Sequence, residues 1–213
     1  MNRDKIQVIF FYCVIALLIL GIGGFGYYFY LENNRWQSYK NDPAKKQFFE
    51  TIENIANKNP ADITNEEYLT MGNAYEELGE FKKAAEAYQS SIDKGPTNVA
   101  QINLAGVYAS AGEYKKAQDK YLEIVEKNWG LTDVFLKLAE LYKKDWDGKK
   151  YDQLSILIYG LEKNPNNYEL LVNLGMNYKE VGNKEKALEY LQKAYEINTA
   201  NESLKSDIAE LKK

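Results

Sequence analysis

Three glycines near the start of the chain have the spacing of a nucleotide-phosphate site. Gly21, Gly23 and Gly26 satisfy the pattern G-x-G-x-x-G after an apolar run, and Asp42 follows at about the distance of a ribose-binding acid. That fingerprint requires a short strand before the glycines and a strand–helix–strand unit around them. Here the preceding run is far longer than a strand and the following residues have helical periodicity. The glycines therefore do not predict a nucleotide site, and we expect them to let helices or lipids approach closely.

The other residue types that carry chemistry give little support for catalysis. The chain has no histidine and one cysteine, Cys13, which excludes Ser–His and Cys–His nucleophiles and histidine metal sites. Asp and Glu are scattered without a cluster. The formal net charge of −4 argues against nucleic acid as the main partner, because a phosphate backbone is held mostly by excess Lys and Arg. The sequence predicts no enzyme, no cofactor and no metal site.

Residues 6–31 form the most apolar part of the chain and contain no charged residue. As a helix they would rise about 39 Å, which exceeds the roughly 30 Å of a bilayer core. Aromatic residues gather at the far end, where an interfacial belt is expected. They are Tyr27, Tyr28, Tyr30 and, a little further on, Trp36. The sequence therefore predicts a short tail at 1–5 and a single transmembrane anchor helix at 6–31.

A cleaved signal peptide is the alternative for this segment. Arg3 and Lys5 precede the apolar run, and small residues lie between Gly21 and Gly26, as at a cleavage site. However, the apolar run continues through an aromatic block after the glycines. That continuation favours an anchor that stays in the membrane.

The rest of the chain carries an internal repeat of two helices. A small residue followed three positions later by tyrosine occurs four times, at a spacing of about 34 residues. The pairs are Gly72 and Tyr75, Ala105 and Tyr108, Ala139 and Tyr142, and Gly175 and Tyr178. Three copies then have a glycine that can end a helix, at Gly79, Gly112 and Gly182. A small residue in the next helix follows, at Ala84, Ala117 and Ala187.

These motifs resemble the tetratricopeptide repeat family. The match covers about residues 64–200, although the third copy has extra residues between Tyr142 and Tyr151 and has Leu154 in place of the usual alanine. The resemblance implies an all-α fold. It implies an α-solenoid of about four helix pairs, stacked so that their first helices line a concave face.

Segments on both sides of the array are expected to be helical as well. Residues 32–63 are predicted to be a juxtamembrane linker followed by a helix that begins at Asp42 and Pro43. Residues 201–213 are predicted to be a capping helix, because an open solenoid end needs an amphipathic cover. The apolar face of that helix carries Leu204, Ile208 and Leu211.

The concave face is predicted to bind a partner protein. In tetratricopeptide repeats the first helix of each pair lines the groove, and the resemblance places two rows of residues there. The apolar row consists of Leu69, Ile102, Leu136 and Val172. The polar row consists of Asn73, Asn103, Lys137 and Asn173. The functional interpretation is a groove for an extended peptide or a helix; the alternative is that some apolar side chains belong to the core between repeats.

Three residues of the polar row, Asn73, Asn103 and Lys137, match places where a chaperone-binding subset of the family clamps a C-terminal carboxylate. The two other places hold Leu69 and Asp133, where that subset has basic residues. Without that positive charge a carboxylate is poorly held. The resemblance therefore does not imply a carboxylate clamp.

The lysine-rich loop at 143–150 offers a separate candidate, Trp146. It could dock a partner or touch anionic lipid head groups. The alternative, which we favour, is a solvated turn whose tryptophan packs on the neighbouring repeat.

These features predict a non-catalytic, single-pass membrane protein that acts as a scaffold in complex assembly. Its partners are expected to be proteins of a bacterial envelope assembly, such as a secretion, motility, pilus, respiratory or translocon complex, with no nucleic acid and no small-molecule substrate. The alternative function is a periplasmic chaperone that holds secreted clients transiently.

The side of the membrane is predicted from charge and cysteine content. Positive charges flanking residues 6–31 slightly favour a cytoplasmic array, but long domains cross a membrane largely regardless of charge. The array lacks cysteine, which suits an oxidising compartment. We expect a location at the inner membrane with the array on the periplasmic side.

Overall fold

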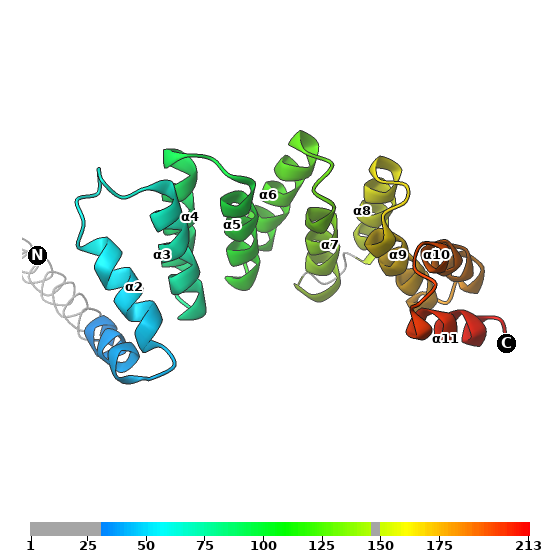
Figure 1. Ribbon diagram of the computed structural model, residues 1–213, viewed down its shortest axis with the longest axis horizontal. Coiled ribbons are helices and arrows are strands. Elements are labelled where there is room, and N and C mark those ends of the chain that lie inside the picture. Colours follow the sequence, from blue (N-terminus) through cyan, green and yellow to red (C-terminus); the bar gives the residue numbers. More distant parts are fainter. Residues whose placement is uncertain (1–30, 146–149) are drawn as a thin grey trace, which may run out of the picture. The chain divides into compact units, whose positions relative to one another are not determined.

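The computed structural model describes residues 31–145 and 150–213 (Figure 1). The chain forms two compact units, Met1–Pro60 and Ala61–Lys213. Residues 1–30 lie outside the described ranges, and they include the predicted tail, the predicted anchor up to residue 30, and Tyr27, Tyr28 and Tyr30. Trp146 also lies outside the described ranges. Across the two described ranges there is no strand, and no helix combines the length and the apolar character needed to cross a bilayer.

The described part of the first unit is helical. Residues 31–41 form a helix where the sequence predicted a short linker, and α2 (Lys46–Ala56) follows. Trp36 lies edge-on to Tyr39 with 5.6 Å between the ring centroids, and 5.9 Å from the ring of Phe49 on α2. These aromatic contacts pack the two helical segments against each other.

The start of α2 differs from the sequence expectation. The helix was predicted to begin at Asp42 and Pro43, but α2 begins at Lys46. The Asp42 side chain accepts a hydrogen bond from the backbone N–H of Ala44 at 2.9 Å. The Lys46 N–H also donates to the carbonyl of Asp42 at 2.8 Å, so residues 42–45 form a hydrogen-bonded turn that leads into α2.

The described residues of the second unit form four helix pairs and a last helix, in chain order. The pairs are α3 (Asn65–Glu77) with α4 (Phe81–Lys94), α5 (Asn98–Ser110) with α6 (Tyr114–Lys127), α7 (Thr132–Glu140) with α8 (Lys150–Lys163), and α9 (Tyr168–Glu180) with α10 (Lys184–Ile197). The last helix is α11 (Glu202–Leu211). Each helix contacts the next one along the chain, from cyan to red in Figure 1. This stacking confirms the predicted all-α solenoid of four pairs.

Glycine turns join the two helices in three of the four pairs. Gly79, Gly112 and Gly182 have φ values of 75°, 76° and 81°, in the left-handed region that glycine adopts without strain. At the first turn the backbone N–H of Glu80 donates to the carbonyl of Tyr75 at 2.8 Å, which satisfies one of the last carbonyls of α3. The sequence prediction of these glycines as helix ends is confirmed.

Small residues let the two helices of a pair approach closely. A Cβ atom added to Gly72 on α3 would lie 2.5 Å from the ring of Tyr88 on α4, and one added to Gly175 on α9 would lie 2.6 Å from Leu191 on α10. Real Cβ atoms are not found at such distances. Tyr88 and Leu191 are completely buried, so each fills the space that the missing side chain leaves.

The third pair has a different construction. α7 continues directly into a π-helix, η1 (Leu141–Asp145). Here the closest approach uses a glycine on the second helix, because a Cβ added to Gly160 of α8 would lie 2.9 Å from the ring of Phe135. Leu154, at the position of the usual alanine, is half-buried and packs against the core. The departure seen in the sequence therefore corresponds to a changed interface within this pair.

The core consists of separate clusters along the array, and one of them contains Ala84 and Tyr88 of the first pair. Another cluster of buried residues extends from Ala105 on α5 to Ala187 on α10 and includes Phe135, Leu157 and Leu174. A further cluster buries the apolar face of α11 against the fourth pair. It consists of Leu171, Leu191, Ala194, Leu204 and Ile208. The apolar face predicted for the last helix is thus packed against the fourth pair.

Candidate partner-binding groove

The apolar row lies on the four first helices. Leu69, Ile102, Leu136 and Val172 come from α3, α5, α7 and α9 in turn. All four side chains are half-buried and pack on one side against a core cluster. Each residue therefore contributes to the core and still presents apolar surface to solvent. The repeat places this surface at the same point of every pair.

A hydrogen-bond network surrounds the polar row in the first two pairs. The Asn103 side-chain N–H donates to Asn73 Oδ1 at 3.1 Å and so connects α5 to α3. The Tyr88 hydroxyl lies 2.8 Å from Asn73 Oδ1 and 2.7 Å from Glu76 Oε2. Burial, together with the hydrogen bond to Glu76, raises the pKa of Tyr88. The hydroxyl therefore stays protonated and acts as a donor that fixes Asn73 or Glu76.

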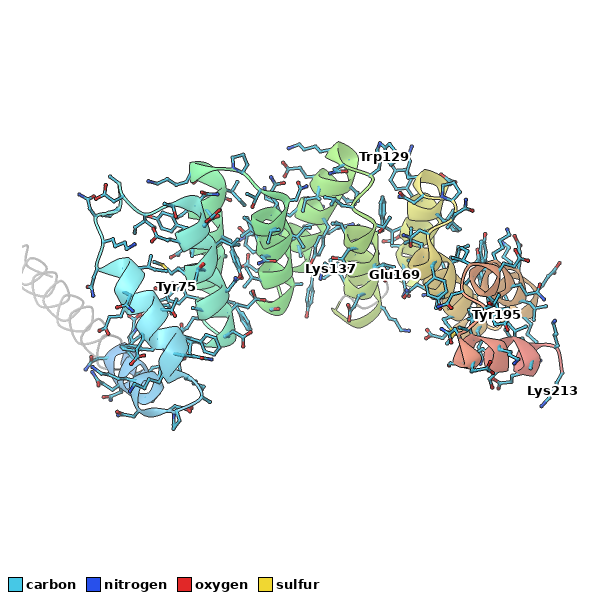
Figure 2. All side chains as sticks on the ribbon, viewed as in Figure 1. Tyr75, Trp129, Lys137, Glu169, Tyr195 and Lys213 are labelled. Atoms are coloured by element: carbon cyan, nitrogen blue, oxygen red, sulfur yellow. The ribbon has the colours of Figure 1, made fainter. Side chains whose placement is uncertain are left out.

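The polar row does not continue in the same form through the third and fourth pairs. Lys137, which Figure 2 labels on α7, has its Nζ 3.8 Å from Asp133 Oδ2. Asn173 donates to the carbonyl of Glu169 on its own helix at 2.8 Å. The charge of Lys137 is therefore partly neutralised by Asp133. This pairing agrees with the sequence argument against a carboxylate clamp.

A hollow of about 370 Å³ lies among α7, α8, α9 and the π-helix. Leu136 and Asn173 from the two predicted rows line it, together with Met176. Two further lining residues, Gln153 and Asn177, are 6% and 3% exposed. Neither residue belongs to the rows predicted from the sequence. The structure thus brings predicted groove residues together with two buried polar side chains from outside the predicted rows.

A comparison among the four copies would have identified Asn177. It lies two positions after the small residue of its copy. The equivalent residues in the other copies are Ala74, Val107 and Leu141, all of them apolar and buried. One polar residue at a position that is otherwise apolar indicates either a cost to stability or a specific role. This signal is present in the sequence.

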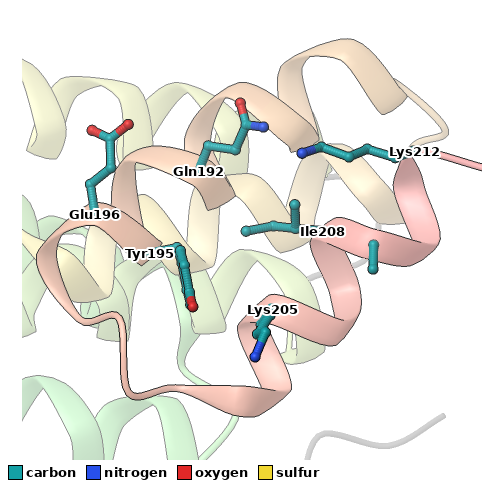
Figure 3. Close-up of a pocket in the computed structure, with 7 residues that line it drawn as sticks. Gln192, Tyr195, Glu196, Lys205, Ile208 and Lys212 are labelled. Carbon is teal, nitrogen blue, oxygen red and sulfur yellow. The ribbon is translucent and has the colours of Figure 1, made fainter.

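A second hollow, of about 510 Å³, lies between α10 and α11 (Figure 3). Tyr195 and Ile208 line it together with exposed polar residues. It contains no residue of the predicted rows. In the part of the chain that the structure describes, no three His, Cys, Asp or Glu side chains are arranged to hold a metal ion.

Comparison with known proteins supports the repeat architecture. Residues 69–131 and residues 168–201 each match a family model described as tetratricopeptide repeat. No curated protein sequence matches the chain.

Several solved structures share the fold. The crystal structure of YrrB, described as a TPR protein with an unusual peptide-binding site, is 24% identical with a TM-score of 0.50, over 67% of this chain and 73% of that one. A crystal structure of MamA protein is 20% identical with a TM-score of 0.56, over 77% and 92% of the two chains. Pseudomonas aeruginosa pilF is 19% identical with a TM-score of 0.53, over 69% and 67%. At these identities the likeness concerns the fold.

Proposed function

Because the chain carries tetratricopeptide repeats, we propose that it is a non-catalytic, membrane-anchored scaffold whose first-helix groove binds a partner protein or peptide. One observation carries this proposal: all four first helices have a half-buried apolar residue at the same position, Leu69, Ile102, Leu136 and Val172. Regularly spaced apolar contacts suit an extended peptide or a helix laid across the array.

The membrane anchor is part of this proposal and is supported by the sequence of residues 6–31, which is uncharged and long enough to span a bilayer. With this anchor, the array would work at a membrane. We propose an assembly of the bacterial envelope, such as a secretion, motility, pilus, respiratory or translocon complex, with the array on the periplasmic side of the inner membrane.

Crosslinking in living cells tests where the partner binds. A photoreactive amino acid is placed at Asn173, an exposed position of the polar row, or at Ile197, which is 49% exposed and lies outside both rows. We expect a partner to be captured in a fixed ratio from Asn173 and not from Ile197. Equal products from the two positions would contradict a binding groove. Capture of many unrelated secreted chains from Asn173 would instead support the transient chaperone.

Substitution of the apolar row tests whether it supplies the binding energy. The double variant Leu69→Asp and Ile102→Asp places charge where a partner would need apolar surface, so we expect at least a tenfold loss of partner recovery. The matched control is Val181→Asp with Ile197→Asp, which changes two exposed apolar residues outside the row. Circular dichroism checks that both variants keep their helical content, and Leu69→Ala with Ile102→Ala replaces the first variant if it does not. Undiminished recovery would exclude the row as the binding surface.

A further inference from the structure

One face of α5 leaves apolar surface in contact with water. Val99, Ile102, Gly106 and Ser110 recur at the spacing of a single helix face, and we call them the outward stripe of α5. Val99 is 55% exposed and Ser110 is exposed, whereas Ile102 and Gly106 are half-buried. The stripe is therefore a candidate contact surface for another protein.

The helix that carries this stripe has no charge. α5 contains no charged residue, whereas α3, α7 and α9 each contain several. The whole segment 95–112 lacks Asp, Glu, Lys and Arg. A helix face that meets only water usually carries charged and polar side chains. The uncharged character of α5 therefore favours a surface that is covered when the protein is assembled with its partner.

Gly106 lies in the middle of the stripe, and the fold does not require a glycine there. A Cβ atom added to Gly106 would meet only the Tyr121 hydroxyl, at the ordinary contact distance of 3.5 Å. The equivalent residues in the other copies are Asn73, Glu140 and Met176, and all of them carry side chains. A glycine inside a helix destabilises it relative to alanine. In return, this glycine leaves room for a second backbone to approach α5 closely.

Two exposed carboxylates without ion pairs lie on α3, next to this stripe. Glu66 and Glu77 have the same places on α3 that Val99 and Ser110 have on α5. Neither glutamate forms an ion pair within the described part of the chain, and α3 contains no lysine or arginine. The 3.1 Å hydrogen bond between asparagines of α3 and α5 shows that these faces lie side by side.

The helix on the other side of α5 does not offer the same charge. α5 lies between α3 and α7 in the array (Figure 1). On α7, Asp133 is paired with Lys137 at 3.8 Å. The surface beside the stripe is therefore acidic mainly on the α3 side, so a partner would place its basic residues there.

The separation of the two glutamates indicates the conformation of the bound segment. At 1.5 Å per residue, Glu66 and Glu77 are about 16 Å apart along the axis of α3. A helix aligned with α5 can reach both carboxylates with lysine or arginine side chains from one of its flanks. A peptide that crossed the array at right angles to α3 could reach only one of them.

We propose that the outward stripe of α5 binds an amphipathic helix of the partner protein, aligned with α5. Its apolar face lies over Gly106, and its lysine or arginine side chains face Glu66 and Glu77. Helices that dock in this way use apolar residues three and four positions apart. This inference rests on the proposed function and names the conformation and charge of the segment that is bound.

The spacing of crosslinks tests the helical conformation. The photoreactive amino acid p-benzoylphenylalanine replaces Val99 or Ser110 in the full-length protein in living cells, and mass spectrometry locates the crosslinked residue of the partner. We expect the two partner residues to be about 11 apart, as in a helix, with lysine or arginine between them. A spacing of about five residues, as in an extended peptide, would overturn the proposal. Crosslinks to a second copy of this chain would overturn it as well.

Removal of the two carboxylates tests the charge. In the double variant Glu66→Gln and Glu77→Gln, we expect capture from Val99 to fall at least fivefold, because the partner's basic residues lose their acceptors. The matched control is Glu86→Gln with Glu126→Gln, which changes exposed glutamates on α4 and α6. Circular dichroism checks that both variants keep their helical content. Equal capture by the two variants would contradict a contact with α3.

The variant Gly106→Met separates binding from folding, since Met176 occupies the equivalent position in the fourth copy. Its side chain fills the space over the stripe, so we expect capture from Val99 to fall at least tenfold while Tm is unchanged or raised. If Gly106→Met fails to fold, Gly106→Ala takes its place, with at least a threefold fall expected. Undiminished capture, or a lowered Tm in Gly106→Ala, would show that Gly106 does not serve the partner.

The position of capture distinguishes this inference from the proposed function. Capture from Asn173 without capture from Val99 or Ser110 would retain a groove partner and exclude a helix on α5. Absence of capture from all three positions would contradict the proposed function too.

Discussion

At the scale of single residues, the array depends on matched sizes across each helix pair. Gly72 faces Tyr88 and Gly175 faces Leu191, so a small residue on the first helix meets a large one on the second. Protein interiors are close-packed, and an added methyl group must displace a neighbour. Because Tyr88 is fully buried, its ring has little room to move.

The substitution Gly72→Ala tests this complementarity. Its new Cβ would lie 2.5 Å from the Tyr88 ring, so we expect the free energy of unfolding to fall by about 1–3 kcal/mol. Gly106→Ala is the matched control. Its Cβ would meet only the Tyr121 hydroxyl at 3.5 Å, and replacing a helical glycine by alanine stabilises a helix by up to about 1 kcal/mol. Urea unfolding measures both values; equal effects of the two substitutions would contradict the close approach.

The sequence predicted this residue-level pattern only in part. Gly72, Gly175 and the residues opposite them follow from the repeat spacing, since every copy must solve the same packing problem. The contact of Gly160 with Phe135 did not follow, because there the small residue has moved to the second helix. A repeat motif contains only the residue types that the copies share. It therefore could not indicate Asn177 and Gln153, which differ in type from the equivalent residues of the other copies.

At the scale of helices, the caps and turns explain where each element begins and ends. The α3 helix begins with a capping box in which Thr64 accepts from the backbone N–H of Glu67 while the Glu67 side chain accepts from that of Thr64. Asn167 and Asn201 cap α9 and α11 through their side-chain oxygens. These local bonds are encoded within a few residues, so the sequence next to each cap specifies where the helix begins.

The π-helix and the helical residues 31–41 could not be predicted in the same way. The extra residues after Tyr142 indicated a longer connection, but they did not specify its geometry. Residues 31–41 are mostly polar, and their packing depends on Trp36, whose partner Phe49 is on α2. The conformation of these segments depends on contacts between elements. The spacing of residues within one element does not reveal those contacts.

The last helix offers a prediction at this scale. Leu204 is 3% exposed in the cluster with Leu171 and Leu191, so Leu204→Ala should destabilise α11 by about 2 kcal/mol or more. Amide hydrogen exchange should accelerate in α10 and α11. Lys205→Ala, at the exposed neighbouring position, is the control. Faster exchange in α3 and α4 to the same extent would show that the array unfolds as one block and would contradict a local effect.

At the scale of the whole chain, an uncharged apolar segment precedes an array with a mixed, exposed surface. Cys13 is the only cysteine in the sequence and lies inside the apolar segment. A cysteine introduced elsewhere would therefore be the one thiol outside that segment. This property allows the proposed orientation to be measured without removing a native residue.

The variant Lys115→Cys reports the side of the membrane. The Lys115 side chain is 71% exposed, and its ion pair with Asp119 is too exposed to contribute much stability. We expect a membrane-impermeant maleimide to label this variant in intact spheroplasts, because the array is proposed to lie outside the inner membrane. Labelling only after lysis would place the array in the cytoplasm. Wild-type protein, which keeps Cys13, should stay unlabelled in intact spheroplasts.

The first two glycine turns have a consequence for how such a chain can change its length. Residues 79–84 and 112–117 both read Gly-Glu-aromatic-Lys-Lys-Ala, and Gly79 and Gly112 have nearly the same φ. Unequal crossing-over between the two stretches of coding sequence would delete residues 80–112 and leave the junction chemically intact. The shortened product would place Tyr121 opposite Gly72, where Tyr88 had been. Recombination within the gene could thus shorten or lengthen the array by one whole repeat at a time.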